Sequence, residues 1–399
     1  MKEIRFKQTE IGLLPEDWNV TTLSRVCKIF GRIGYRGYST ADIVTPENGA
    51  ISISPTNIIN GQMDYTKCTY ISWHKYNESP EIKIYNGDIL IVKTGSTYGK
   101  SALVKSLAQK ATINPQIVVL KDINIDNVFL SYVCLTPQFL EQVESVIVGG
   151  AIPTLSQKKM GQFIIPQLCI KEQKKIASAL TAIDNLLLSL EKLIEKKRLI
   201  KQGTMQELLT GKKRLPGFTG EWVERQVKDI GSIGRGRVIS QKEIERSYQH
   251  KYPVYSSQTQ NNGIMGYIDT YDFEGEYITW TTDGVNAGTV FYRNGLFNCT
   301  NVCGTIKLHK DNHLFVSMRL GLETNNYVST NLANPKLMNN VMKQIVIDLP
   351  ETVEEQKAIA SVLSSMDREI ESLEGKKAKY EQIKQGMMQQ LLTGKIRLI

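Results

Sequence analysis

Several features that mark common protein classes are scarce in this chain of 399 residues. No apolar run approaches the roughly 18 residues that a membrane-spanning helix needs. Residues 1–10 are polar, so we expect neither membrane insertion nor export. The 6 cysteines are scattered and include no Cys-x-x-Cys pair, which argues against a disulfide framework and favours a reducing compartment. The expected location is therefore the cytoplasm.

Metal-ligand spacing is also poor. Cys299, Cys303, His309 and His313 form a cluster of suitable residue types, in the order C-x3-C-x5-H-x3-H. The gap between the two pairs is far shorter than in a zinc finger, and the cysteines lie in a strand-like stretch. We therefore expect no metal site in this chain.

Catalytic motifs are incomplete. The glycine-rich segment Gly95–Ser101 is one residue short of a phosphate-binding loop, and Ala102–Val104 after it suits a hairpin strand rather than the required helix. Asn114–Ile117 lacks the second proline and the aromatic ring of the Asn-Pro-Pro-aromatic element of adenine methyltransferases. Loose nuclease spacing occurs at Asp64, Glu81 and Lys83. We expect no catalysis by this chain, and a single-chain nuclease or methyltransferase with its own active site stays an alternative.

The chain does contain one segment twice, in the same direction. Glu172–Lys174 recurs as Glu355–Lys357, an offset of 355 − 172 = 183 residues, and the match runs without a gap to Leu208–Lys212 and Leu391–Lys395. A long ungapped repeat implies two structural units built to one plan. We therefore expect the protein to perform one task twice.

Both copies of the repeat have the periodicity of a long helix. Apolar residues alternate at four- and three-residue steps, which is typical of a coiled-coil seam. The first copy, Lys171 to Leu209, covers 39 residues, or roughly 58 Å of helix, which is too long for a helix on a small domain. We expect the two helices to pair, against the alternative of two unrelated surface helices. The predicted seam consists of Ile176, Leu180, Ile183, Leu187, Leu190, Ile194, Ile359, Leu363, Met366, Ile370 and Leu373.

The helices also carry glycines and caps at matching places. Thr352 begins a capping-box spacing, and Gly211 and Gly394 stand where a left-handed residue would close each helix. Gly203 and Gly386 lie inside the helical patterns, where each costs about 1 kcal/mol against alanine. Close approach of another helix and a simple kink are both open explanations for these two.

The segment before each helix repeats more loosely. Trp18 and Trp222 each follow a Leu-Pro pair, and Gly87–Gly95 corresponds to Gly275–Gly284. Each segment closes with a Pro-x-Leu element, Pro153–Leu155 or Pro335–Leu337. The framework therefore repeats while the loops differ. The predicted division is into globular domains at 1–165 and 213–348 and helical segments at 166–212 and 349–399.

In this order and in duplicate, these motifs resemble the specificity subunits of type I restriction-modification systems. The resemblance covers nearly the whole chain. It rests on the paired Leu-Leu-Thr-Gly-Lys helix ends, the Glu-Gln-x-x-Ile-Ala helix starts, the Leu-Pro pairs before tryptophan and the Gly-Asp-Ile-Leu-Ile strand motif. The second unit departs from that strand motif at Gly275–Trp280. The resemblance implies an α+β fold with two mixed α/β target-recognition domains, separated by two long antiparallel helices that form a coiled coil with pseudo-two-fold symmetry.

The same resemblance implies a function. Each domain would read half of a bipartite target in double-stranded DNA, and the helices would set the half-site spacing and dock two modification subunits, which restriction subunits join. S-adenosylmethionine, ATP and Mg would belong to those partners, with adenine methylation and ATP-dependent cleavage, and this chain would bind none of them. A coiled-coil adaptor without sequence-specific DNA binding is a second alternative.

Charge and loop composition suit DNA. The net charge is +9 with a pI near 9.0, a bias that favours a polyanionic partner. Base reading requires Arg and Lys for phosphates and hydrogen-bonding side chains for base edges. The loops between strands supply both, and the predicted contacts are Arg32, Arg36, Tyr38, Ser96, Thr97, Tyr98, Lys100, Arg235, Arg237, Gln258, Asn261, Asn262, Thr281 and Thr282.

Overall fold

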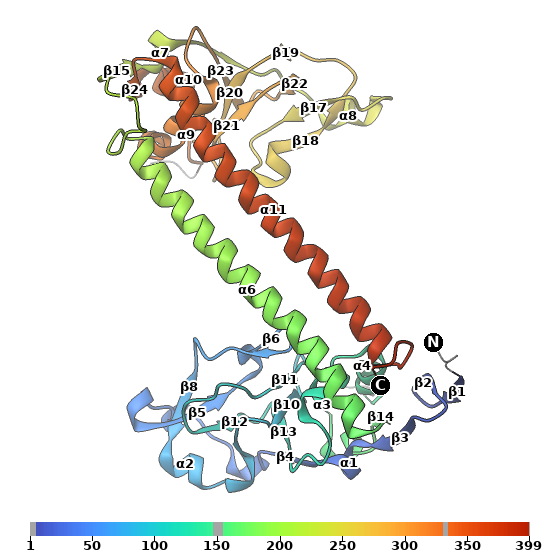
Figure 1. Ribbon diagram of the computed structural model, residues 1–399. Helices are drawn as coiled ribbons and strands as arrows, with labels where there is room; N and C mark the ends of the chain where they lie inside the picture. The colour runs from blue at the N-terminus through green and yellow to red at the C-terminus, as the bar shows by residue number, and fades with distance from the viewer. Residues whose placement is uncertain (1–4, 147–154, 330–333, 399) are drawn as a thin grey trace. The chain divides into compact units, whose positions relative to one another are not determined.

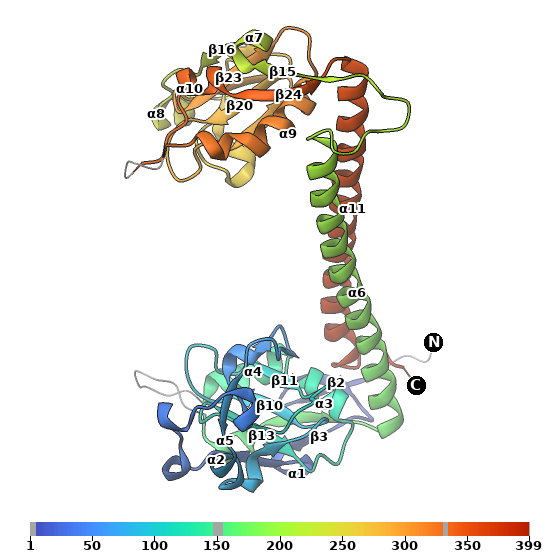
Figure 2. The same cartoon turned by 90° about the vertical axis from the view of Figure 1, so that its left-hand side faces the viewer.

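The computed structural model describes residues 5–146, 155–329 and 334–398. The chain forms two compact units, and these are residues 1–190 with 376–399, and residues 191–375. Each unit holds one globular domain and a part of each of two long helices (Figures 1 and 2). Among the described residues, no helix is long and apolar enough to cross a membrane.

The two long helices are α6 (Ile170–Leu208) and α11 (Val353–Leu391), and each has 39 residues. The bounds of α6 lie one residue from those predicted, because the heptad pattern that fixes them is local. Gly211 and Gly394 follow the helices, both with a φ of +69°. The predicted left-handed closures are therefore confirmed.

In the first unit, the start of α6 lies against the end of α11. Lys384 of α11 pairs with Asp184 of α6 at 2.6 Å. Arg397, just after α11, binds Glu172 in the first turn of α6 at 2.6 Å. Contacts that move forward along α6 therefore move backward along α11, so the helices run antiparallel in this unit.

The second unit contains the same arrangement with the helices exchanged. Lys201 of α6 pairs with Asp367 of α11. Arg214, just after α6, binds Glu355 in the first turn of α11 at 2.6 Å. Arg214 and Arg397 are separated by the repeat offset, since 397 − 214 = 183. The predicted antiparallel pairing is thus confirmed within each unit.

Most of the predicted seam is buried. The buried members are Ile176, Leu180, Ile183, Leu190, Ile194, Ile359, Leu363 and Ile370. Leu187, Met366 and Leu373 are half-buried. At one end of each seam the helix joins a domain core, since Ile176 shares a buried cluster with Leu392, and Ile359 shares another with Leu209. The seam therefore ties each helix pair to a globular domain.

Gly203 and Gly386 are helical glycines without close neighbours. A Cβ added at either position meets nothing within 4 Å, so the described residues do not support close approach of a helix as the reason for glycine. Replacement of either glycine by alanine is expected to stabilise the protein by about 1 kcal/mol, because alanine is the better helix former. Urea denaturation of the single variants measures this gain. A loss of stability instead would contradict the open surroundings seen here.

Three of the sheets in the first domain have counterparts in the second domain. Two are four-stranded, with orders β11-β10-β13-β4 and β8-β5-β12-β9, and the third joins β14 to β3. In the four-stranded sheets β12 and β5 pair in parallel, and every other neighbouring pair is antiparallel. The strands are β3 (Asn19–Thr22), β4 (Lys28–Gly31), β5 (Gly49–Ile53), β8 (Thr69–Ser72), β9 (Lys83–Ile84), β10 (Ile89–Val92), β11 (Ser101–Leu103), β12 (Ala111–Ile113), β13 (Ile117–Lys121) and β14 (Ile164–Gln167).

The second domain repeats this topology. Its sheets have the orders β21-β20-β23-β16, β18-β17-β22-β19 and β15-β24, with the one parallel pair, β17 and β22, at the corresponding place. The strands are β15 (Trp222–Gln226), β16 (Gly231–Arg235), β17 (Tyr252–Tyr255), β18 (Ile264–Ile268), β19 (Phe273–Glu274), β20 (Tyr277–Thr281), β21 (Val290–Arg293), β22 (Leu296–Cys299), β23 (Cys303–Leu308) and β24 (Val346–Pro350). The predicted loose repeat of the globular parts is therefore a repeat of fold.

Short elements complete the domains. In the second domain α9 lies along the sheet that contains β20 and β21 (Figure 2). Besides short 3-10 turns, the remaining elements are the strands β1 (Phe6–Thr9), β2 (Gly12–Pro15), β6 (Ile58–Ile59) and β7 (Gln62–Met63) and the helices α1 (Leu23–Val26), α2 (Trp73–Asn77), α3 (Asn127–Val133), α4 (Pro137–Ser145), α5 (Gln157–Met160), α7 (Val227–Ile230), α8 (Gln241–Arg246), α9 (His313–Glu323) and α10 (Asn339–Gln344).

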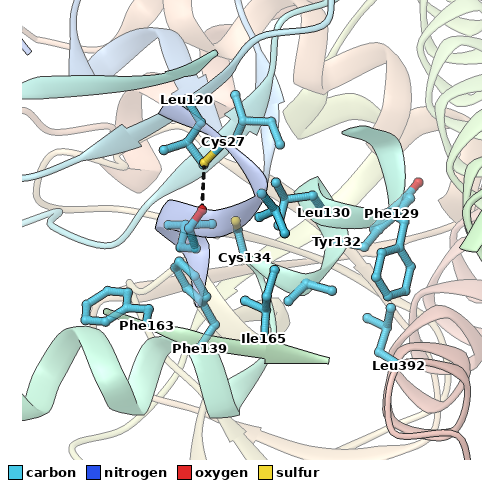
Figure 3. Packing of buried hydrophobic residues seen from close by; sticks show 14 of the residues in the cluster. Cys27, Leu120, Phe129, Leu130, Tyr132, Cys134, Phe139, Phe163, Ile165 and Leu392 are labelled. Carbon is cyan, nitrogen blue, oxygen red and sulfur yellow. Dashed lines mark hydrogen bonds between the residues drawn. The ribbon is translucent and has the colours of Figure 1, made fainter. Parts of the chain in front are cut away.

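The core of the first unit buries two cysteines as ordinary apolar groups. Cys27 and Cys134 lie among Phe139, Leu392 and other apolar side chains (Figure 3). The Cys27 thiol donates to the Leu23 carbonyl at 3.3 Å. Burial raises the pKa of Cys27 to about 12, so it stays protonated at neutral pH and its role is to fill space.

One paired position in the first sheet is filled differently in the two domains. Trp280 lies opposite Gly304 in the second domain, whereas Ile91 lies opposite Val118 in the first. A Cβ added to Gly304 would lie 2.2 Å from the Trp280 ring, so the large ring requires a glycine partner. Trp280 Nε1 also donates to the Leu337 carbonyl at 2.9 Å. The second domain therefore accommodates Trp280, which departs from the strand motif of the first domain, by having Gly304 on the neighbouring strand.

Candidate nucleic-acid interface

Loops from distant parts of the chain meet where the central strands of one sheet end, in the sheet β11-β10-β13-β4 of the first domain and in the sheet β21-β20-β23-β16 of the second. In the first domain, the Lys93 N–H donates to the Gln116 carbonyl at 2.8 Å, and the Leu155 N–H donates to the Lys93 carbonyl at 2.8 Å. In the second domain, the Thr282 N–H donates to the Val302 carbonyl at 3.0 Å, and the Leu337 N–H donates to the Thr282 carbonyl at 2.9 Å. Pro153 and Thr154 of the first Pro-x-Leu element lie outside the described residues. We call these places the loop edges, which comprise residues 93–100, 114–116 and 155–158, and residues 282–289, 300–302 and 334–339.

A turn bounded by two glycines stands at the centre of each loop edge. Gly95 and Gly99 have φ values of +100° and +82°, and Gly284 and Gly288 have +93° and +87°. The N–H of each closing glycine donates to a carbonyl of the preceding strand, at 2.9 and 2.8 Å. Only glycine readily adopts these φ values, so the two turns share one backbone frame. The residues between the glycines differ: they are Ser96, Thr97 and Tyr98 in the first domain, and Val285, Asn286 and the buried Ala287 in the second.

The turn of the first domain is not a nucleotide-binding loop. The strand β11 follows it and pairs antiparallel with β10. A phosphate-binding loop instead leads into a helix whose N–H groups hold the phosphate. The prediction of a hairpin strand rather than a helix at Ala102–Val104 is therefore confirmed, with the strand at Ser101–Leu103.

The predicted DNA contacts differ in how far they reach solvent. Six are exposed: Ser96, Lys100, Arg235, Arg237, Asn261 and Asn262. Five are half-buried: Arg36, Tyr38, Thr97, Tyr98 and Gln258. Three are buried: Arg32, Thr281 and Thr282. Contact with DNA stays a prediction for the first two groups.

The prediction that Arg32 contacts DNA is wrong. Its side chain is only 4% exposed, and the guanidinium donates to the Ile113 carbonyl at 3.2 Å, the Arg36 carbonyl at 3.2 Å and Thr112 Oγ1 at 3.3 Å. Burial lowers the pKa of this arginine. Because β4 ends just before Arg32 and β12 carries two of the acceptors, this side chain ties the two sheets together.

The prediction that Thr281 and Thr282 contact DNA is also wrong. Both are fully buried, at 0% exposure, where β20 ends. Thr282 Oγ1 donates to Asp283 Oδ2 at 2.5 Å. The residue types of this segment suggested a loop, but β20 continues through Thr281, which pairs with Cys303 of β23, and the Thr282 N–H that follows donates to the Val302 carbonyl at 3.0 Å.

Arg235 and Arg237 belong to one glycine-arginine run and have different surroundings. Arg237 donates to Glu243 at 2.6 Å and to Asp272 at 2.9 Å. The Glu243 hydrogen bond raises the pKa of Arg237, and the Arg237 hydrogen bond lowers the pKa of Glu243. Arg235 contacts the sulfur of Met338, at 3.7 Å, and no ion pair joins it to a carboxylate among the described residues. Its charge is therefore the better placed for a phosphate.

Replacement of Arg235 by alanine is expected to weaken duplex binding and to reduce the slope of log affinity against log salt by about 1, because one phosphate contact is lost. Arg237→Ala is the matched control, and we expect a smaller change in slope because two carboxylates already balance its charge. Binding of a duplex over a series of salt concentrations measures both slopes. Equal slopes for the two variants would contradict this assignment.

Two features were not predicted from the sequence. Val285 is 91% exposed at the tip of the second turn, and an exposed aliphatic group there is suited to contact with a thymine methyl. Its alignment with Ser96 was the available signal. The second feature lies outside the loop edges, at the helix ends: it is the pair Arg214 and Arg397, which a continuation of the repeat beyond Lys212 and Lys395 would have shown.

Cys299, Cys303, His309 and His313 have the residue types of a metal site, although their spacing is poor. Among the residues that the structure describes, no group of three or more His, Cys, Asp or Glu side chains is placed to hold a metal ion. Cys299 and Cys303 are buried in the second domain. His313 Nε2 accepts the Leu308 N–H at 3.0 Å, and burial lowers the pKa of this histidine. It is thus a satisfied core group.

A family model with the description Type I restriction modification DNA specificity domain matches residues 15–202 and 219–382. The chain belongs to this family. The two matched segments each contain one globular domain and part of a long helix, so the family model recognises the same repeat as the fold. The alternatives of a single-chain enzyme and of a structural adaptor find no support in this membership.

Similar proteins agree with the family. The specificity subunit of the type I restriction enzyme MpnII of Mycoplasma pneumoniae is 43% identical over 145 residues, which are 36% of this chain and 43% of that protein. The chain thus spans less than half the length of that relative. The type I restriction-modification S subunit of M. genitalium has the same fold, with a TM-score of 0.62 and 16% identity over 94% of this chain and 96% of that one. A chain from a type I system studied for complex assembly and conformational transition gives a TM-score of 0.60 and 15% identity over 96% and 99%.

Proposed function

We propose that this protein is the DNA sequence-recognition subunit of a type I restriction-modification complex and that each domain reads one half of a bipartite target. One observation carries the proposal. The two domains share three kinds of sheet and the same glycine-bounded turn, but that turn presents Ser96, Thr97 and Tyr98 in one domain and Val285 and Asn286 in the other. A constant frame with different side chains suits two half-sites of different sequence.

The long helices would set the half-site spacing and dock two modification subunits, which restriction subunits join. Support comes from α6, whose surface carries apolar side chains that the seam does not use. Leu193 is 38% exposed, Leu199 59% and Ile200 45%. Exposed apolar groups on a helix suit contact with a protein partner. The structural likeness to a chain studied for complex assembly is consistent with such partners.

Catalysis would reside in the partners. They would bind S-adenosylmethionine, ATP and Mg, methylate adenine and cleave DNA. This chain would recognise the target sequence and bind none of these cofactors. The incomplete phosphate loop, which forms a hairpin turn, supports this division. A subunit with these duties works beside the DNA, so we place it in the cytoplasm.

Mapping of methylated adenines in a host that carries this chain with its modification subunits tests the proposal. The expected result is one motif made of two short half-sites of specified sequence, separated by a fixed number of unspecified bases. No methylation is expected when this chain is absent. Methylation by the purified chain alone would support the single-chain enzyme instead. Methylation that is independent of sequence would support the adaptor.

A further inference from the structure

The space between the two large sheets is filled differently in the two domains at one equivalent position. Val104 and Arg293 each lie five residues after the glycine that closes the shared turn, Gly99 or Gly288. Val104 is fully buried in a cluster of aliphatic side chains. Arg293 is 3% exposed, so the second domain buries a cation where the first buries a valine.

The surroundings of Arg293 hold its guanidinium without neutralising it. The guanidinium carbon lies 3.6 Å from the centre of the Tyr255 ring and 4.3 Å from that of Phe291. Nε donates to Thr279 Oγ1 at 3.3 Å, whereas Nη1 has no hydrogen-bond partner. No ion pair joins Arg293 to a carboxylate of the described residues, and burial lowers its pKa. Such burial is costly, and Val104 shows that this framework forms without it.

The Arg293 guanidinium lies beside the loop Ser256–Gly263, which adjoins the loop edge of the second domain. A Cβ added to Gly263 would lie 3.1 Å from Arg293 Nη2. The loop that contains Gly263 runs from Ser256 and is closed by a hydrogen bond from the Ser256 N–H to the Gly263 carbonyl at 2.9 Å. The Thr300 N–H donates to the Tyr255 carbonyl at 2.8 Å, which fastens the start of this loop to the loop edge of the second domain.

The tip of the loop carries two exposed amides in an uncommon conformation. Asn261 and Asn262 have φ values of +48° and +53°, which asparagine tolerates better than most residues. Asparagine side chains can pair with a base edge through two hydrogen bonds. A loop with two consecutive left-handed residues keeps this shape only where its surroundings support it.

We propose that Arg293 is a positioning residue for base reading by the second domain, and that its guanidinium supports the loop Ser256–Gly263 so that Asn261 and Asn262 face the DNA in one orientation. The inference rests on the proposed function, because it assumes that this domain reads a half-site. Arg293 itself touches no base. The retained arginine thus serves recognition at a cost to the stability of the domain core.

The test compares Arg293→Val, which installs the residue of the first domain, with the wild-type chain in complex with its modification subunits. Affinity is measured for the mapped target and for duplexes with one base changed in either half-site, and thermal unfolding is followed in parallel. We expect an unchanged or raised melting temperature. Discrimination against base changes in the second half-site should fall about tenfold or more, while discrimination in the first half-site stays at the wild-type value.

A folded Arg293→Val variant with wild-type discrimination in the second half-site would overturn the inference. Arg293→Lys keeps the charge and loses the planar group between the rings, so it should show the same selective loss; it decides the question if the valine variant does not fold. A loss of discrimination in both half-sites would also overturn the inference, because it would indicate a general structural role. If the wild-type chain discriminates in neither half-site, the proposed function itself fails.

Discussion

Arg397→Ala is expected to lower the free energy of unfolding of the first unit by about 3 kcal/mol, because it leaves a buried carboxylate without its partner. Glu172 is only 3% exposed, and both of its oxygens accept from the Arg397 guanidinium, at 2.6 and 2.8 Å. The same guanidinium binds Asp17 through two bonds of 2.8 Å. It therefore joins the segment after α11 to the first turn of α6 and to the start of the first domain.

The repeat supplies a second, independent copy of this experiment. Arg214 binds the two oxygens of Glu355 at 2.6 Å each, and Glu355 is 2% exposed. Arg214→Ala should therefore destabilise the second unit by a similar amount. Lys395→Ala, an exposed neighbour of Arg397, is the control and should change stability by less than about 0.5 kcal/mol. Guanidinium chloride denaturation measures each value; losses below about 1 kcal/mol for both arginines would contradict a structural role for these ion pairs.

Removal of one heptad from each long helix is expected to change the spacing of the two half-sites and to leave both half-site sequences unchanged. Seven residues correspond to about 10 Å of helix, or roughly three base pairs. A whole heptad preserves the seam register, so the paired deletion of Leu187–Leu193 and Gly375–Glu381 keeps apolar residues on the facing sides. Removal of seven residues from α6 alone breaks the pairing and serves as the control.

Maps of methylated adenines from a host with the paired deletion give the result. We expect a motif with the original half-site sequences and a shorter spacing between them. A motif with the original spacing would show that the helices do not set the spacing. A changed half-site sequence would show that the helices take part in base reading.

The helices and the turn frame were predictable because their signals are local. The heptads and the closing glycines Gly211 and Gly394 lie within short windows of sequence, and the repeat shows each of these signals twice. The hairpin after Gly99 followed from the absence of a helical pattern. In each case the backbone geometry depends on the residues that adopt it.

The fate of individual arginines was not predictable in the same way, because it depends on residues far along the chain. Arg32 is buried since Thr112 and Ile113, about 80 residues later, accept its hydrogen bonds. Arg237 is balanced by Asp272. Arg293 is no member of a glycine-arginine run, and its role follows from the sheet that brings Tyr255 beside it. A basic residue in a loop is thus a weak guide to DNA contact.

The account depends most on the claim that one domain reads one half-site. Exchange of residues 1–165 for the same segment of a relative with a different target, followed by mapping of methylated adenines, tests it directly. The predicted result is a new sequence in one half-site, with the sequence of the other half-site and the spacing unchanged. A change in both half-site sequences, or in neither, would contradict the claim.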